Sequence, residues 1–92
     1  MASFNWSADK NRELIASRGV SFEQVVFYIE HGVLLDDICH PNTRDYAHHR
    51  MFVVNIDGYA YLVPYVESEN EIFLKTVIPS RKFTQLYVGG AK

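Results

Sequence analysis

The apolar positions of this chain follow a helical period in its first third and an extended period after residue 50. The clearest helical stripe has the spacing i, i+3, i+4, i+7 and comprises Phe22, Val25, Val26 and Ile29. Ser21 precedes the stripe as an N-cap, with Gln24 three residues on, and Gly32 follows it. The pattern predicts a core-facing helix that ends near His31.

A first helix is predicted upstream, because Ser7 is a good N-cap and the segment from Ala8 to Arg18 ends at Gly19. Its apolar side is thin. We therefore expect Phe4 and Trp6 to pack beneath it and to complete its contact with the core.

Three apolar runs of extended character follow, and the first two flank the dipeptide Asp57-Gly58. Asp-Gly between β-rich runs is a strong hairpin signal, so Arg50–Ile56 and Tyr59–Val63 are predicted to pair. The third run, Ile72–Ile78, extends the hairpin into a meander. Pro64 indicates a bulge or an edge, because proline has no N–H to give to a ladder.

The remaining segments complete an α+β domain. Val33–Cys39 is a candidate for a further short strand, the region from Asn42 to His49 reads as a loop, and Ser80 caps a final short helix from Arg81 to Tyr87. The predicted fold has two N-terminal helices, an antiparallel meander of three to four strands and a short C-terminal helix. We expect the helices to cover one face of the sheet.

Length and composition indicate one domain: the 92 residues are 48% hydrophobic, enough for one core. The single cysteine, Cys39, has no internal disulfide partner, which favours a reducing cytoplasm. No secretory pattern and no apolar run long enough to span a bilayer is evident, so no membrane association is expected.

The net charge of −2 argues against a protein that wraps nucleic acid with its whole surface. The charges are nevertheless segregated along the chain. Acidic residues gather at Asp36, Asp37, Glu67, Glu69 and Glu71, and basic residues at Arg44, Arg50, Lys75, Arg81 and Lys82. Any contact with nucleic acid is therefore expected to be local, and the same segregation suits a charged protein partner.

Metal and hydrolase chemistry are weakly indicated. His40, His48 and His49 lack the spacing of a ligand set, since adjacent histidines on an extended segment point to opposite faces. Cys39 has only His40 as a sequence neighbour, and no nucleophile elbow or glycine-rich phosphate loop occurs. We expect neither a metal nor a cofactor.

The remaining candidates are cations and imidazoles of the kind that metal-free RNA cleavage uses: a base for the 2′-hydroxyl, cations for the phosphorane and an acid for the leaving oxygen. The candidates are His48, His49, Arg50, Lys75, Arg81 and Lys82. The plainer interpretation of Arg81 and Lys82 is a solvated helix end. The six tyrosines supply possible stacking faces for bases, but aromatic residues are enriched in strands anyway.

Two segments resemble a known family. The pattern Phe4-x-Trp6-x-x-x-Lys10-x-x-x-Leu14, followed by Arg18-Gly19-Val20-Ser21-Phe22-Glu23, resembles the opening of BrnT-type toxins. The ending Ile78-Pro79-Ser80-Arg81-Lys82, with Tyr87 beyond it, is similar to the ending of that family. The segment Phe83-Thr84-Gln85-Leu86 departs from it, because family members carry a basic final helix there.

The resemblance implies a RelE-like fold and a bacterial type II toxin that cleaves RNA without a metal. It also implies a cognate DNA-binding antitoxin of the ribbon-helix-helix kind, through which alone DNA would be contacted. By motif it carries across Lys10, Arg81, Lys82 and Tyr87, whereas His48, His49, Arg50 and Lys75 rest on the chemical argument above. In the resulting hypothesis the catalytic residues are Arg81 and Arg50, which hold the scissile phosphate together with Lys82, and His48 or His49, which exchanges protons together with Tyr87. Lys10 and Lys75 are further candidates for binding RNA. The alternative is a non-catalytic module on the same fold that binds a protein partner.

Overall fold

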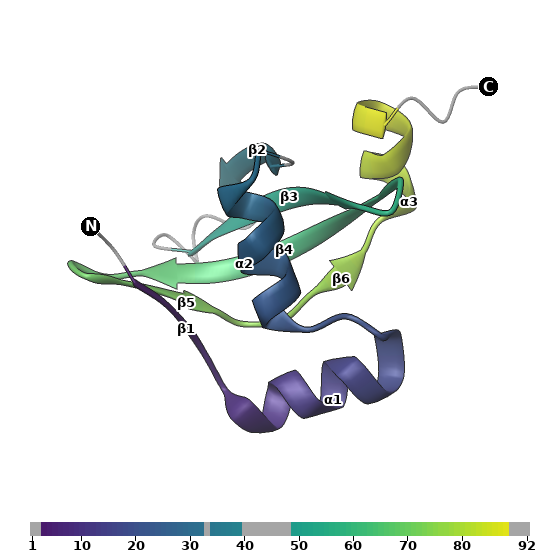
Figure 1. Cartoon of the computed structure of the whole chain (residues 1–92). Coiled ribbons are helices and arrows are strands. Elements are labelled where there is room, and N and C mark those ends of the chain that lie inside the picture. Colours follow the sequence, from purple (N-terminus) through teal and green to yellow (C-terminus); the bar gives the residue numbers. More distant parts are fainter. Residues whose placement is uncertain (1–2, 33, 40–48, 89–92) are drawn as a thin grey trace.

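The computed structural model describes residues 3–32, 34–39 and 49–88 of the chain. Within these ranges it is an α+β fold in which two helices precede most of a mixed sheet in the chain and a short helical segment follows it (Figure 1). In chain order the elements are β1 (Ser3–Trp6), α1 (Ala8–Arg18), α2 (Phe22–Glu30), β2 (Leu34–Cys39), β3 (His49–Ile56), β4 (Tyr59–Glu67), β5 (Glu71–Leu74), β6 (Ile78–Pro79), α3 (Arg81–Phe83) and the π-helical turn η1 (Thr84–Val88).

The strands lie in the order β1-β5-β4-β3-β2, with β6 paired to β4. The predicted hairpin is confirmed: β3 and β4 pair antiparallel, and Asp57 and Gly58 have the positive φ values of 55° and 84° that its two-residue turn requires. β5 pairs antiparallel with β4, which completes the predicted meander.

The N-terminal strand β1 was not predicted. It runs parallel to β5, with Phe4 opposite Ile72 and Trp6 opposite Leu74, so the sheet is mixed and not purely antiparallel. Phe4 and Trp6 do pack against the core, but they reach it from the sheet. A strand of four residues that pairs with a segment far along the chain has too little local sequence pattern to be predicted.

Both predicted N-terminal helices are confirmed. The Ser7 hydroxyl accepts the N–H of Lys10, and Gly19 ends α1 in the left-handed region at φ 70°. The Ser21 hydroxyl accepts the N–H of Gln24 at the start of α2. The helical stripe of α2 faces the sheet as expected, with Phe22 and Val25 fully buried.

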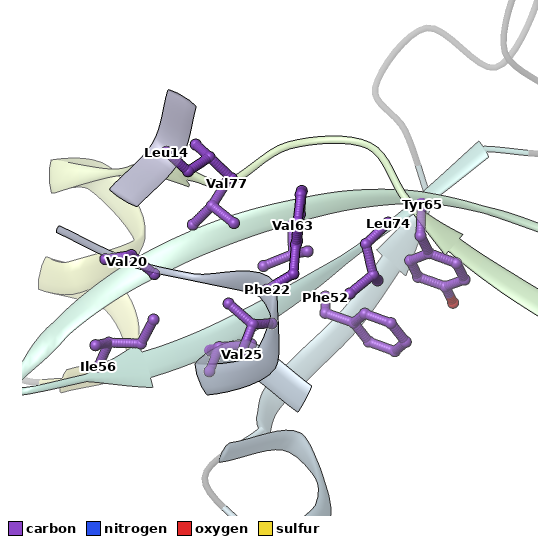
Figure 2. Packing of buried hydrophobic residues seen from close by; sticks show 11 residues of the cluster. Leu14, Val20, Phe22, Val25, Phe52, Ile56, Val63, Tyr65, Leu74 and Val77 are labelled. Atoms are coloured by element: carbon purple, nitrogen blue, oxygen red, sulfur yellow. The ribbon is translucent and has the colours of Figure 1, made fainter. Parts of the chain in front are cut away.

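The core lies between the two N-terminal helices and one face of the sheet (Figure 2). Alternation along β3 assigns Phe52, Val54 and Ile56 to this face, and Val63 and Tyr65 of β4 lie opposite and beside them. We call this surface the helix-covered face. Met51, Val53 and Ala60 alternate with these residues and are also buried, at 6%, 0% and 0% exposure, on the opposite face.

The third predicted strand, Ile72–Ile78, is not continuous. β5 pairs with residues 65–67 of β4 and β6 with residues 61 and 62, so Lys75, Thr76 and Val77 lie outside both ladders. Pro64 stands at the interruption and accepts the Lys75 N–H at 2.8 Å. Because proline has no N–H to return on that side, the ladder breaks there.

The C-terminal helix begins where expected, since the Ser80 hydroxyl accepts the Phe83 N–H at 3.2 Å. It continues as α3 and then widens into η1. Thr84 fastens it to the sheet by accepting the Ala60 N–H and donating to the Ser80 carbonyl. The expectation that all helices cover one face is wrong, because this segment reaches the face opposite α1 and α2, where Tyr87 meets Asp36.

Candidate functional site

Arg50 is the second residue of β3, and residues on the two neighbouring strands hold its side chain in place. Tyr65 of β4 lies directly opposite it, and Asp37 of β2 lies opposite Phe52, one pleat further along the same face. The Arg50 Nε donates to Asp37 Oδ1 at 3.2 Å and to the Tyr65 hydroxyl at 3.2 Å, and Nη2 donates to the Asp37 carbonyl at 2.9 Å. These contacts fix the plane of the guanidinium.

Tyr65 is the buried member of this cluster. Its side chain is 2% exposed, and its ring stacks on Phe52 with centroids 4.0 Å apart (Figure 2). Its hydroxyl donates to Asp37 Oδ1 at 2.8 Å. Burial, followed by this hydrogen bond, raises the pKa of Tyr65, so the phenol stays neutral across the physiological range.

Arg50 is a charged and partly exposed member of this cluster. The hydrogen bond to Tyr65 and the negative charge of Asp37 raise the pKa of Arg50. The side chains of Arg50 and Asp37 are 37% and 38% exposed. We call Arg50, Asp37 and Tyr65 the arginine cluster. Its partly exposed guanidinium lies at one end of the helix-covered face, and the guanidinium is the side-chain group whose planar fork suits a phosphate.

Tyr87 lies elsewhere. Its hydroxyl donates to Asp36 Oδ2 at 2.5 Å. Asp36 pairs with Val53, whereas Asp37 pairs with Phe52, so the two carboxylates point to opposite faces of the sheet. Arg50 and Tyr87, both predicted as catalytic, are therefore not brought into one cleft.

Arg81 and Lys82 are exposed at the start of α3, and neither makes an ion pair with any residue that the structure describes. Ser80, just before them, donates its N–H to the carbonyl of Ala60, five residues along β4 from Tyr65. At about 3.3 Å per residue that separation is roughly 16 Å. The two cations thus lie near the other end of β4 from the arginine cluster.

The two remaining cations are also separate. Lys10, in the first turn of α1, pairs with Glu13 at 3.5 Å, and α1 lies at the opposite end of the molecule from α3 (Figure 1). Lys75 is exposed, with its Nζ 5.6 Å from the centre of the Phe73 ring. Since Phe73 pairs with Val66 and alternates with the buried Leu74, Lys75 and Phe73 share the face opposite Arg50.

The two histidines are outside the part of the chain where side chains are described. His48 lies outside the described residues altogether, and for His49 the description covers the backbone, which pairs with Val66. Within the described ranges no group of three His, Cys, Asp or Glu side chains is arranged to hold a metal ion. None of the described helices has the length and apolar character needed to cross a membrane.

Sequence reasoning missed Asp37 and Tyr65 as partners of Arg50. A signal for Tyr65 was present, because a two-residue turn at Asp57-Gly58 sets the hairpin register and places residue 65 opposite residue 50. No such signal existed for Asp37, since the connection from β2 to β3 is long and does not set a register.

Comparison of the chain with known protein families, with curated proteins and with solved structures yields no match.

Proposed function

We propose that this chain is a metal-independent endoribonuclease and the toxin of a type II toxin–antitoxin pair, of the BrnT type and with a RelE-like fold. The observation that carries the proposal is the arginine cluster, in which Asp37 and Tyr65 hold the guanidinium of Arg50 in a fixed plane at the surface. Two further features support it: the motifs at both ends of the sequence, and the order of two helices, a β-meander and a C-terminal helix.

In the proposed reaction Arg50 binds the scissile phosphate and stabilises the charge that develops on its oxygens. The 2′-hydroxyl attacks the phosphorus, the P–O bond to the 5′-oxygen breaks, and the products carry a 2′,3′-cyclic phosphate and a 5′-hydroxyl. His48 and His49 directly precede Arg50 in the sequence, and one of them exchanges the protons. Tyr87 stays outside this site because it lies on the other face.

Arg81 and Lys82 take a different part in this proposal. They lie too far along β4 to hold the same phosphate as Arg50, but a single-stranded RNA that crosses the molecule reaches both places. Lys10 and Lys75 are exposed or half-exposed cations on other surfaces, where they contribute to non-specific attraction.

The test is cleavage of a labelled single-stranded RNA by the purified protein in the presence of EDTA. We expect products with 2′,3′-cyclic phosphate ends, and a loss of about 100-fold or more in rate for Arg50→Ala. Arg18→Ala is the matched control, because Arg18 is an exposed arginine in the last turn of α1. Intact RNA with folded wild-type protein, together with unchanged growth of cells that express it, would reject the nuclease proposal.

A second candidate, a non-catalytic module that binds an antitoxin-like protein, is favoured by one specific observation. Apolar side chains are exposed at the C-terminal end of the chain, with Leu86 at 64%, Ile78 at 40% and Tyr87 at 38%. If a small ribbon-helix-helix protein is encoded beside this chain, co-expression with it distinguishes the two. In a binding module Leu86→Asp abolishes co-purification, while Arg50→Ala changes neither co-purification nor growth.

A further inference from the structure

The geometry points to Tyr65 as the positioning residue of the site: its hydroxyl orients the Arg50 guanidinium toward a phosphodiester of single-stranded RNA. This inference rests on the proposed ribonuclease function. It assigns to a core residue a part in the reaction that neither its position in the sequence nor its burial alone would suggest.

The Tyr65 hydroxyl is the point where the other two members of the cluster meet. It donates its proton to Asp37 Oδ1 at 2.8 Å and accepts the Arg50 Nε–H at 3.2 Å. Asp37 Oδ1 in turn accepts from Arg50 Nε at 3.2 Å. Each of the three groups therefore contacts both others. Removal of the hydroxyl abolishes the contacts of residue 65 with Asp37 and with Arg50.

Only Tyr65 is held rigidly by the core. Its ring is 2% exposed and stacks on Phe52 at 12° between the ring planes. Asp37 and Arg50 are more than a third exposed, and Asp37 lies on β2, the last strand of the sheet on that side. A long arginine side chain at a surface samples several rotamers unless a fixed group restrains it. The phenol contributes to that restraint, together with the Asp37 main-chain carbonyl, which accepts from Arg50 Nη2 at 2.9 Å.

Orientation matters because a guanidinium binds a phosphate through two parallel N–H groups in one plane. With Nε and Nη2 turned toward Asp37, the plane of the guanidinium is set by the cluster before any ligand arrives. Such preorganisation lowers the entropy lost when the reacting groups are aligned. A lysine at position 50 has one charged nitrogen and no plane to orient, so Arg50→Lys is not expected to restore activity.

The inference is tested with Tyr65→Phe, which keeps the ring and the core packing and removes the hydroxyl. Tyr61→Phe is the matched control: Tyr61 lies on the same strand and packs against the same core, and among the described residues its hydroxyl makes no hydrogen bond. Asp37→Asn is a second variant that weakens the cluster from the surface. Thermal unfolding of every variant establishes that it is folded.

Three readouts are combined: the rate of RNA cleavage, the affinity for the same RNA with 2′-deoxy substitution at the cleaved position, and the ¹H–¹⁵N signal of Arg50 Nε–H. We expect a resolved, slowly exchanging Nε–H signal in the wild type that is lost in Tyr65→Phe and kept in Tyr61→Phe. Cleavage by Tyr65→Phe falls about tenfold, as for the loss of one hydrogen bond to a charged group, mostly in kcat. The double variant Tyr65→Phe/Arg50→Ala is no slower than Arg50→Ala.

The outcomes separate the two proposals. Unchanged cleavage and an unchanged Nε–H signal in Tyr65→Phe, with an active wild type, would overturn the positioning role and leave the nuclease proposal standing. A slower Tyr65→Phe whose effect simply multiplies with that of Arg50→Ala would also overturn it. A wild-type protein that neither cleaves nor binds RNA would overturn the proposed function, and the positioning role toward RNA with it.

Discussion

Asp36 and Asp37 are neighbours in β2, yet their carboxylates serve opposite faces of the sheet: Asp36 accepts from Tyr87 and Asp37 from Tyr65. The alternation of side chains along β2 thus separates two polar contacts, although the aspartates that make them are adjacent in the sequence. Asp37 belongs to the arginine cluster, and Asp36 ties the C-terminal helix to β2. The two side-chain contacts use different carboxylates, although Asp36 Oδ1 also accepts the Asp37 backbone N–H at 2.8 Å.

The bond between Asp36 and Tyr87 is expected to hold between two pH limits. The hydrogen bond from Tyr87 lowers the pKa of Asp36 below its ordinary 3.8, and the bond to Asp36 raises the pKa of Tyr87 above its ordinary 10.0. The hydrogen bond makes its full contribution to the free energy of unfolding between pH 3.8 and pH 10.0. It is lost as pH falls through the lowered pKa of Asp36, and again as pH rises through the raised pKa of Tyr87.

NMR titration of the Tyr87 ring carbon next to the hydroxyl measures this effect. Asp36→Asn should bring the pKa of Tyr87 back toward 10.0. Asp37→Asn, a change of the same chemistry one residue away, should leave the Tyr87 titration as it is. An equal response to both variants would contradict the assignment of the two carboxylates to different faces.

Asn11 is expected to be the most sensitive polar position of the two N-terminal helices. It is 9% exposed, its Oδ1 accepts the Phe22 N–H at 2.7 Å, and its Nδ2 donates to Glu23 Oε1 at 2.8 Å. Asn11→Ala leaves the buried Phe22 N–H without an acceptor and should cost about 1–3 kcal/mol in urea unfolding. Asn5→Ala, which removes an exposed hydrogen bond to Glu71, should change stability by less than about 0.5 kcal/mol.

The same contact has a pH signature. The hydrogen bond from Asn11 is the main cause that lowers the pKa of Glu23 below its ordinary value of 4.5. Its stabilising effect is present above pH 4.5 and is lost as pH falls through the lowered pKa. In Asn11→Ala this part of the acid-induced loss of stability should shrink, and an unchanged acid profile would contradict the role given to Asn11.

Thr84 is expected to secure the C-terminal helix through its hydroxyl. The hydroxyl accepts the N–H of the fully buried Ala60 at 2.8 Å and donates to the Ser80 carbonyl at 2.7 Å. Thr84→Val keeps the shape of the side chain but leaves the Ala60 N–H without an acceptor, which should destabilise the protein by about 1–3 kcal/mol. Thr84→Ser keeps both bonds and should unfold close to the wild type; a similar loss in both variants would point to the methyl group instead.

Arg81 and Lys82 are expected to affect RNA affinity without affecting stability. Both are exposed at the start of α3, so their alanine variants should unfold like the wild type. Each phosphate contact that is lost should flatten the slope of log affinity against log salt by about 0.7 for a single-stranded RNA. Fluorescence anisotropy at several salt concentrations measures the slope, with Arg18→Ala as control, and an unchanged slope would identify these cations as a solvated helix end.

Local patterns accounted for the elements that are formed by neighbouring residues. The caps at Ser7, Ser21 and Ser80 and the Asp57-Gly58 turn all act within a few positions of the chain, and each lies where the sequence places it. The α+β class followed from these elements. Even the break in the third strand had a visible cause in Pro64.

The remaining features depend on contacts between distant segments. The parallel pairing of Trp6 with Leu74 and the approach of Asp37 to Arg50 are determined by how the sheet is ordered, which hydrophobic periodicity does not encode. The same limit applied to the candidate site. Charge and the family motifs grouped Arg50, Arg81 and Tyr87 in one predicted site. In the structure Arg50 and Tyr87 lie on opposite faces of the sheet, and Arg81 lies near the other end of β4 from Arg50.

The parallel pairing of β1 with β5 has a consequence for the order of folding. Ser3 pairs with Glu71, so the pairing of β1 with β5 closes a loop that contains most of the described chain. The helices and the β3–β4 hairpin close short loops and are expected to form first, whereas β1 closes the longest loop. Substitutions in β1 should therefore speed unfolding more than they slow folding, and this strand should be the first to exchange its amide protons in the native protein.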